Sequence, residues 1–207
     1  MPHPIARTLV VTALSLIVFG GGAQADLFPG DPMPRTGTRA VGVDGLEIVV
    51  DNYMGDAGTL VIFTCNSCDY GKRLNRRAVE LAHRYRLQGI GAMLINSNDP
   101  SYDSADGLEQ MKTMAQELEL KVPYVVDDGS VIAKAFGATV TPEVFLFDGG
   151  GRLVYRGAVN DDPDGVLDAG QEWLAWALDS LVKGDDVSQP VTRAVGCDIR
   201  FHERRAE

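Results

Sequence analysis

The sequence is short of basic residues and of cysteines. It carries 19 Lys and Arg against 29 Asp and Glu, a net charge of −10 at pH 7. Such a surface repels nucleic acids and anionic lipids, so no nucleic-acid partner is expected. The three cysteines, Cys65, Cys68 and Cys197, cannot all be paired within one chain. The odd one therefore needs an explanation.

Long apolar runs are also scarce. The run from Leu9 to Phe19 is too short to span a bilayer. Arg7 before it and the small residues Ala23 and Ala25 after it are typical of a cleaved export signal over residues 1–25, with an uncleaved anchor as the alternative. We then expect a periplasmic or secreted protein without stable membrane insertion, 18 basic against 29 acidic residues and a net charge of −11. Its domain would occupy residues 26–190, followed by a tail at 191–207.

The periodicity alternates between strand-like and helix-like runs and shows no repeat, which predicts one α/β domain. The run "TLVIFT" at 59–64 has the composition of a strand buried on both faces, and a helical pattern follows from Cys68 to Gly89. The order continues with a strand at 91–96, a helix near 108–118 and the strand-like "YVVDD". It ends with the short helix candidate "VIAKAFGA", a hairpin of "EVFLFD" and "RLVYRG", and a helix at 171–182.

Cys65 and Cys68 lie where the buried strand leads into the first helix. Residues three apart on a helix are neighbours, so this pair can close a small disulfide ring. We expect Cys65 at the helix N-terminus, where backbone N–H groups and the basic residues that follow (Lys72, Arg73, Arg76 and Arg77) would stabilise its thiolate. Cys65 is then the attacking thiol and Cys68 the resolving one.

Other uses of these cysteines stay open. A static disulfide would stabilise little, because so small a ring removes little unfolded-state entropy. Zinc would need two further ligands, which Cys197 and His202 could supply, although far along the chain. Copper transfer through soft thiolates would need a third ligand, for which neither Met54 nor His83 is well placed.

Thr141 and Pro142 precede the strand of "EVFLFD". Proline inside a central strand would break its hydrogen bonding, so we expect Pro142 at the start of the strand, after a cis peptide bond in a tight turn.

Together, "FTCNSC", "INSND" at 95–99, "TPEVFLFD" and "VGCDIRF" resemble the thioredoxin superfamily, in particular exported thioredoxin-like or redoxin proteins related to alkyl hydroperoxide reductase and thiol-specific antioxidant. The resemblance runs from about Gly30 to Phe201. It implies an α/β thioredoxin fold, a central mixed sheet flanked by helices, with an N-terminal β extension and a short C-terminal tail.

The resemblance further implies a thiol–disulfide oxidoreductase without a metal or other cofactor. Thr141 and Pro142, with Asn66 and Ser67 between the cysteines, would line the groove that receives protein disulfide substrates. The family pattern often has His and Pro where this chain has Ser67 and Asp69, and both changes make the pair less oxidising. We therefore expect a reductase or isomerase-like role, in which a membrane-bound electron donor keeps the cysteine pair reduced.

A thiol-dependent peroxidase is the alternative activity. The resemblance to peroxiredoxins would require the motif Pro-x-x-x-Thr-x-x-Cys. Before Cys65 this chain has Ile62 in place of the threonine and Gly58 in place of the proline, so the motif is absent.

Cys197 is expected either as a buried apolar residue or as a third thiol in the exchange. Residues 160–171 nearly match a calcium loop but end in Gln171, so a solvated acidic turn is the default interpretation.

Overall fold

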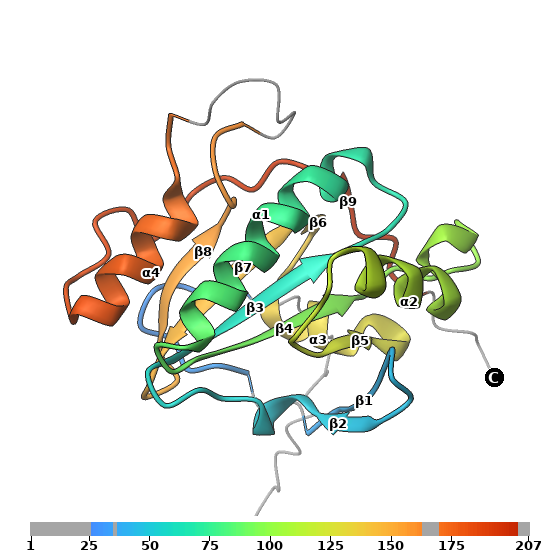
Figure 1. Cartoon of the computed structure of the whole chain (residues 1–207), viewed down its shortest axis with the longest axis horizontal. Coiled ribbons are helices and arrows are strands. Elements are labelled where there is room, and N and C mark those ends of the chain that lie inside the picture. Colours follow the sequence, from blue (N-terminus) through green and yellow to red (C-terminus); the bar gives the residue numbers. More distant parts are fainter. Residues whose placement is uncertain (1–25, 35–36, 163–169, 203–207) are drawn as a thin grey trace, which may run out of the picture.

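The computed structural model describes residues 26–34, 37–162 and 170–202, which form a mixed sheet between two layers of helices (Figure 1). The order of its seven strands is β2-β1-β5-β4-β3-β7-β8. The strands of this sheet are β1 (Arg39–Gly42), β2 (Glu47–Val49), β3 (Gly58–Thr64), β4 (Ile90–Asn96), β5 (Tyr124–Val126), β7 (Glu143–Asp148) and β8 (Leu153–Gly157). The α-helices are α1 (Asp69–Arg86), α2 (Leu108–Glu117), α3 (Val131–Phe136) and α4 (Trp173–Lys183). A separate pair joins β6 (Val140–Thr141) to β9 (Cys197–Asp198), and short 3₁₀ helices occupy η1 (Val50–Asn52), η2 (Ser104–Asp106) and η3 (Asp128–Ser130).

Strand β3 forms the centre of the sheet, and all seven of its residues are buried. It pairs in parallel with β4 and antiparallel with β7. Because successive side chains of a strand point to opposite faces, Leu60 and Ile62 pack into one apolar cluster while Val61 and Phe63 pack into another. This confirms the doubly buried strand that the run at 59–64 predicts.

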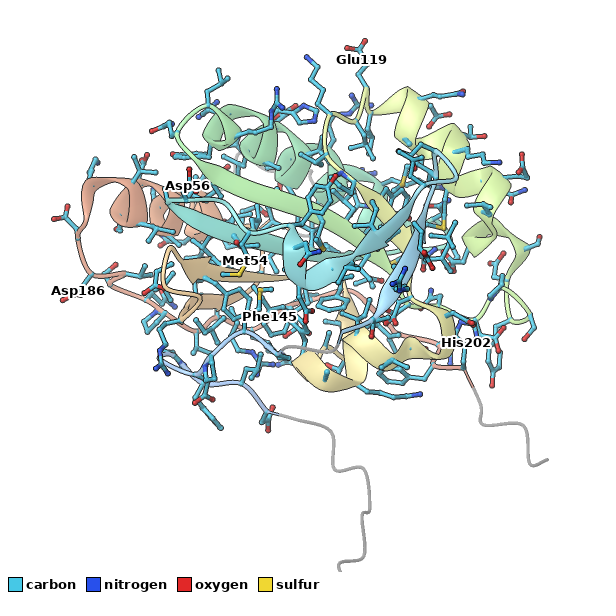
Figure 2. The ribbon with its side chains drawn as sticks, turned by 90° about the horizontal axis from the view of Figure 1, so that it is seen from below. Met54, Asp56, Glu119, Phe145, Asp186 and His202 are labelled. Carbon is cyan, nitrogen blue, oxygen red and sulfur yellow. A yellow bond between two sulfur atoms is a disulfide. The ribbon has the colours of Figure 1, made fainter. Side chains whose placement is uncertain are left out.

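Helices cover both faces of the sheet. One cluster joins β3, β4 and β7 to the apolar sides of α1, α2 and α4, and the other joins the opposite face to α3 and the N-terminal segment. Ile199 of the C-terminal tail belongs to the second cluster. Figure 2 shows Met54 and Phe145 within the molecule on this side, while Glu119 and Asp186 lie at the periphery. The tail is thus part of the packed domain.

The predicted α/β architecture is confirmed, including the N-terminal β extension. The hairpin of β1 and β2 joins the main sheet because β1 pairs with β5. The hairpin of β7 and β8 also forms as expected. Within residues 26–34, 37–162 and 170–202, no helix is long and apolar enough to cross a bilayer. The predicted export signal at 1–25 lies outside the described residues. Most of the acidic turn at 160–171 does so too, because 163–169 are not described.

Candidate active site

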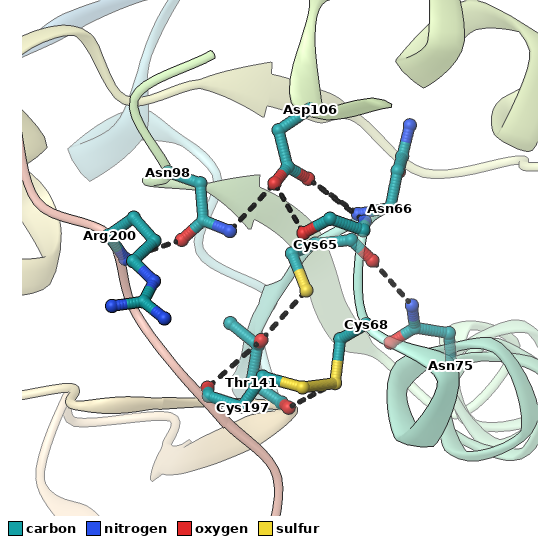
Figure 3. The surroundings of a disulfide bond; sticks show 10 residues. Cys65, Asn66, Cys68, Asn75, Asn98, Asp106, Thr141, Cys197 and Arg200 are labelled. Carbon is teal, nitrogen blue, oxygen red and sulfur yellow. Dashed lines mark hydrogen bonds between the residues drawn. A yellow bond between two sulfur atoms is a disulfide. The ribbon is translucent and has the colours of Figure 1, made fainter. Parts of the chain in front are cut away.

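Cys65 immediately follows β3 and is completely buried. Its Sγ lies 2.9 Å from Oγ1 of Thr141, a contact in which either atom can donate the hydrogen (Figure 3). The peptide bond between Thr141 and Pro142 is cis, as the sequence predicts. The turn before β7 therefore presents a hydroxyl group directly to the thiol.

Cys68 lies three residues further along and is bonded to Cys197. The two Cα atoms are 6.0 Å apart, 129 positions separate the residues in the sequence, and Cys65 remains a free thiol. Sγ of Cys68 is also 3.9 Å from the carbonyl oxygen of Thr141. All three cysteines thus meet at one threonine, because Oγ1 of Thr141 also donates to the carbonyl oxygen of Cys197 at 3.4 Å.

Asp106 fixes the loop between the cysteines. Its Oδ1 accepts hydrogen bonds from the backbone N–H of Asn66 at 2.7 Å and of Ser67 at 3.3 Å. Its Oδ2 accepts from Oγ of Ser67 at 2.7 Å and from Nδ2 of Asn98 at 2.8 Å. Nδ2 of Asn96 also donates to Oδ1, at 3.4 Å. One buried carboxylate therefore accepts from two backbone donors and three side-chain donors of the site.

Two further side chains support the same loop from behind. The hydroxyl of Tyr124, on β5, donates to Oδ1 of Asn66 at 3.0 Å. Nδ2 of Asn75, on α1, donates to the carbonyl oxygen of Cys65 at 3.4 Å. Because Tyr124 and Asn75 are almost wholly buried, the loop is held from the β4–β5 side and from the helix side together.

Burial raises the pKa of the Cys65 thiol above its ordinary value, and the charge of Asp106 acts in the same direction. The hydrogen bond with Thr141 lowers the pKa, but this effect is smaller than that of burial. With Cys68 bonded to Cys197, the surroundings of Cys65 therefore favour the neutral thiol. The expectation of a stabilised thiolate is wrong for this arrangement.

The physical reason lies in where the helix begins. Helix α1 starts at Asp69 and its N-cap is Cys68, so Cys65 lies in the preceding loop and not at the helix N-terminus. The favourable field of a helix falls off within its first turn. The expected placement of Cys65 at the helix end is corrected accordingly.

The disulfide also differs from the expected pairing. Cys68 is bonded to Cys197 instead of Cys65 because the tail crosses the site and β9 pairs with β6. Cys197 is half-buried, so its interpretation as a buried apolar residue is wrong. With Cys68 and Cys197 oxidised, the suggested zinc set of cysteines and His202 cannot form in this state.

Other predicted ligands also have different neighbours. Nε2 of His83 accepts from the backbone N–H of Lys121, and Met54 packs against the apolar cluster that includes Phe145. In the described part of the chain, no group of three or more His, Cys, Asp or Glu side chains is arranged to hold a metal ion.

No local pattern in the sequence indicates Asp106, Asn98 or Tyr124 as site residues. Asn98 lies in "INSND", which carries part of the family resemblance but had no assigned role. Asp106 lies about 40 positions from the loop it binds, so no local spacing connects the two. Only the β4–α2 connection, folded back over the end of the sheet, brings them together.

Comparison with known proteins gives a consistent classification. The family model described as Redoxin matches residues 28–171. The chain is similar in structure to an uncharacterized conserved protein from Geobacillus kaustophilus, with 32% identity, a TM-score of 0.79 and coverage of 87% of this chain and 95% of that one. It is also similar to a hypothetical protein from Sinorhizobium meliloti 1021, with 29% identity, a TM-score of 0.77 and coverage of 85% and 96%.

A more distant likeness concerns the fold alone. The thioredoxin domain of a thiol-disulfide oxidoreductase from Bacteroides vulgatus is 16% identical, with a TM-score of 0.53 and coverage of 66% of this chain and 93% of that one. The comparison with curated proteins found no match.

Proposed function

This chain belongs to the redoxin family, and from that premise we propose that it is a thiol–disulfide oxidoreductase that exchanges disulfides with protein partners through Cys65 and Cys68. The observation that carries the proposal is the meeting of a free thiol and a disulfide at Thr141, within one buried site. Thiol–disulfide exchange needs both groups in contact range.

In the proposed reductase direction, the protein starts with both Cys65 and Cys68 as thiols. We assign the attack to Cys68, and not to Cys65 as expected from the sequence, because Cys68 is the cysteine bonded to Cys197. The Cys68 thiolate attacks a partner disulfide, a mixed disulfide forms, and the partner's first sulfur leaves as a thiolate that takes up a proton. Cys65, after losing its proton, then attacks Sγ of Cys68, which closes the Cys65–Cys68 disulfide and releases the partner's second sulfur. Two electrons pass to the partner, and a membrane-bound thiol donor returns the pair to its reduced form.

The raised pKa of Cys65 favours this direction. A strongly oxidising pair owes its potential to a stabilised thiolate in the reduced protein. Burial and the nearby charge of Asp106 act against that thiolate. We therefore expect a reduction potential closer to the thioredoxin value of about −270 mV than to the strongly oxidising value of about −120 mV.

The alternatives gain less support from the same geometry. Peroxide reduction of the peroxiredoxin kind would need Thr and Pro before the reactive cysteine, where this chain has Ile62 and Gly58. Copper transfer through Cys65 and Cys68 would need a third ligand, and among the described residues no group of three or more His, Cys, Asp or Glu side chains is arranged to hold a metal ion. Disulfide exchange uses both the thiol and the disulfide that are present.

We also propose that the protein works outside the cytoplasm. The support is the signal-like composition of residues 1–25, and a disulfide between distant cysteines persists most readily in an oxidising compartment. Fractionation of cells that express the full chain would test this proposal. Recovery of the protein in the cytoplasm with residues 1–25 intact would contradict it.

Turnover of insulin disulfides with dithiothreitol as electron source tests the activity. Wild-type protein and Cys197→Ser should accelerate reduction above dithiothreitol alone. Cys65→Ser and Cys68→Ser should lose this acceleration, because each lacks one sulfur of the pair. If neither the wild type nor Cys197→Ser accelerates the reaction, the oxidoreductase proposal is wrong.

A further inference from the structure

The C-terminal tail approaches the active site from a fixed anchor on β8. The backbone N–H of Arg156 donates to the carbonyl oxygen of Pro190 at 2.9 Å, and the N–H of Thr192 donates back to Arg156 at 3.0 Å. Oγ1 of Thr192 also contacts the hydroxyl of Tyr155. Figure 1 shows the red segment passing from α4 along the end of the sheet to β9. The tail is therefore tethered before it reaches the cysteines.

Beyond this anchor the tail lies on the active site as an added strand. Thr141 is the register partner of Cys197 in the antiparallel pair β6–β9, and the N–H of Ile199 donates to the carbonyl oxygen of Thr139 at 2.8 Å. Main-chain pairing of this kind is how extended peptides bind a free strand edge. The residue pair that carries it, Thr141 and Cys197, also contacts the thiol site.

Gly196 makes this close approach possible. A Cβ atom at this position would lie 2.1 Å from the carbonyl oxygen of Thr141, which no side chain could occupy without moving the backbone. The residue before the cysteine of a docked segment must therefore be glycine if the segment follows the path of the tail.

A small cavity lies beside the cysteine site. Its volume is about 150 Å³, and its walls include Leu74, Pro142 and Trp173 from the domain. The tail contributes Arg193 and Val195 to the same lining. Val195 lies two residues before Cys197, so the segment places an aliphatic side chain at the cavity while its cysteine reaches Cys68.

The tail is also linked to the loop between the cysteines. Oδ1 of Asn98 accepts from the N–H of Arg200 at 2.9 Å, and Nδ2 of Asn98 donates to Asp106 at 2.8 Å. The N–H of Asp99 donates to the carbonyl oxygen of Arg200 at 2.7 Å. Asn98 therefore contacts both the docked tail and Asp106, which is the clamp of the loop between the cysteines (Figure 3).

We infer that the tail segment at 195–200 is an internal substrate, and that it defines the partner class: an extended segment with an aliphatic residue, a glycine and a cysteine in that order. This inference rests on the proposed function. The Cys68–Cys197 bond occupies the place of the mixed disulfide with a partner, and Cys65 is the thiol that resolves it.

The resolving step conserves atoms and electrons. The Cys65 thiol loses its proton to solvent, its Sγ attacks Sγ of Cys68, and the Cys65–Cys68 bond forms. The bond from Cys68 to Cys197 breaks, and Cys197 leaves as a thiolate that takes up a proton. No net oxidation occurs. The tail can then detach from β6, and the edge of β6 becomes accessible to a partner.

The tether decides how the tail competes with partners. A segment held by a short flexible linker acts at an effective concentration on the order of millimolar. A free partner segment with the same contacts therefore reacts poorly with the wild type at micromolar concentrations. Cys197→Ser removes the competing thiol but keeps the main-chain contacts of the tail, so a peptide must be supplied at about millimolar concentration to replace it.

The direct test uses a synthetic peptide with the sequence of residues 191–201 and oxidised Cys197→Ser protein. The peptide thiolate should attack Sγ of Cys68 and displace Cys65, giving a mixed disulfide that mass spectrometry assigns to Cys68. Peptides carrying Val195→Asp or Gly196→Phe should react at least about tenfold more slowly than the parent. The first loses the apolar contact of Val195 at the cavity, and the second clashes with the carbonyl oxygen of Thr141. A peptide with Ala194→Ser is the matched control and should react like the parent.

The outcomes separate the two proposals. If no peptide reacts and insulin is not reduced either, the oxidoreductase proposal fails. If insulin is reduced but all peptides react at one rate, or the mixed disulfide forms on Cys65, the internal-substrate inference is wrong and the activity stands.

A second variant tests the docking without removing a cysteine. In Gly196→Ala, the added Cβ should push the tail from Thr141, so the oxidised full chain should shift from the Cys68–Cys197 disulfide towards Cys65–Cys68. Ala194→Ser is again the control and should keep the wild-type pairing. Unchanged pairing in Gly196→Ala would contradict the inference.

Discussion

The loop at 65–68 and the tail at 195–200 both carry cysteine, but the domain holds them in different ways. The loop continues a strand that is buried along its whole length and is held by Asp106 through three hydrogen bonds. The tail rests on β6 through a two-residue pair, a few backbone hydrogen bonds and one disulfide. The loop is built as a fixed framework for the sulfurs, whereas the tail is held by contacts that exchange can release.

A substitution in β3, the buried strand that leads into the loop, should have the largest effect on stability. Phe63 is fully buried and makes edge-to-face contacts with Phe136 and Phe145, with ring centroids 5.5 and 5.6 Å apart. Phe63→Ala should lower the free energy of unfolding by about 3–5 kcal/mol, measured by urea denaturation. Val191→Ala, at an exposed position at the start of the tail, should change it by no more than about 0.5 kcal/mol. Equal costs at both positions would contradict the contrast.

The covalent link of the tail should come next. The disulfide closes a loop across 129 positions, and such a bond stabilises by about 2–4 kcal/mol. Cys197→Ser should lower the free energy of unfolding by this amount under oxidising conditions. In excess dithiothreitol the two proteins should unfold alike. A difference that persists in reductant would show that the serine, and not the lost bond, is responsible.

How much of this contrast can be predicted from the sequence depends on how far apart along the chain the interacting residues lie. The β-branched run at 59–64 and the spacing of Leu74, Ala78 and Leu81 are local signals, so they predict β3 and α1. Three cysteines allow three pairings, and nothing local distinguishes Cys68–Cys197 from Cys65–Cys68. The pairing follows from the path of the tail, which depends on Gly196, Thr141 and Asn98 meeting in space.

Asp106→Asn should loosen the framework and change the chemistry of Cys65. Loss of charge-assisted hydrogen bonds to the loop should lower the free energy of unfolding by about 1.5–3 kcal/mol. Because the charge of Asp106 raises the pKa of the Cys65 thiol, its removal should shift the pH profile of Cys65 alkylation to lower pH. Ser97→Ala, outside the clamp and bonded to Asp127, is the control and should leave the profile in place.

The same thiol gives a stability trend with pH. Its pKa is raised in the folded protein, so folding favours the protonated form. The stabilisation is complete below the pKa of the unfolded thiol, ordinarily 9.0, and is lost as pH rises towards the folded pKa. Wild-type protein should therefore lose more stability above pH 9 than Cys65→Ser does. Parallel curves for the two proteins would contradict the burial of this thiol.

The smallest effect should come from the support behind the loop. Tyr124→Phe removes the hydrogen bond to Asn66 and should lower the free energy of unfolding by about 0.5–1.5 kcal/mol. The rate of insulin reduction should fall only slightly, because Asp106 still holds the loop. A loss of stability as large as that of Asp106→Asn would show that Tyr124, and not the carboxylate of Asp106, is the main support of the loop.

Disulfide mapping of the oxidised protein tests the central claim most directly. Free thiols are alkylated in acid, and mass spectrometry of the peptides identifies the bonded pairs. The account predicts a Cys68–Cys197 bond with alkylated Cys65 in the wild type, and a Cys65–Cys68 bond in Cys197→Ser. A Cys65–Cys68 bond with free Cys197 in the resting wild type, or no disulfide in Cys197→Ser, would contradict the claim that Cys68 exchanges between the two partners.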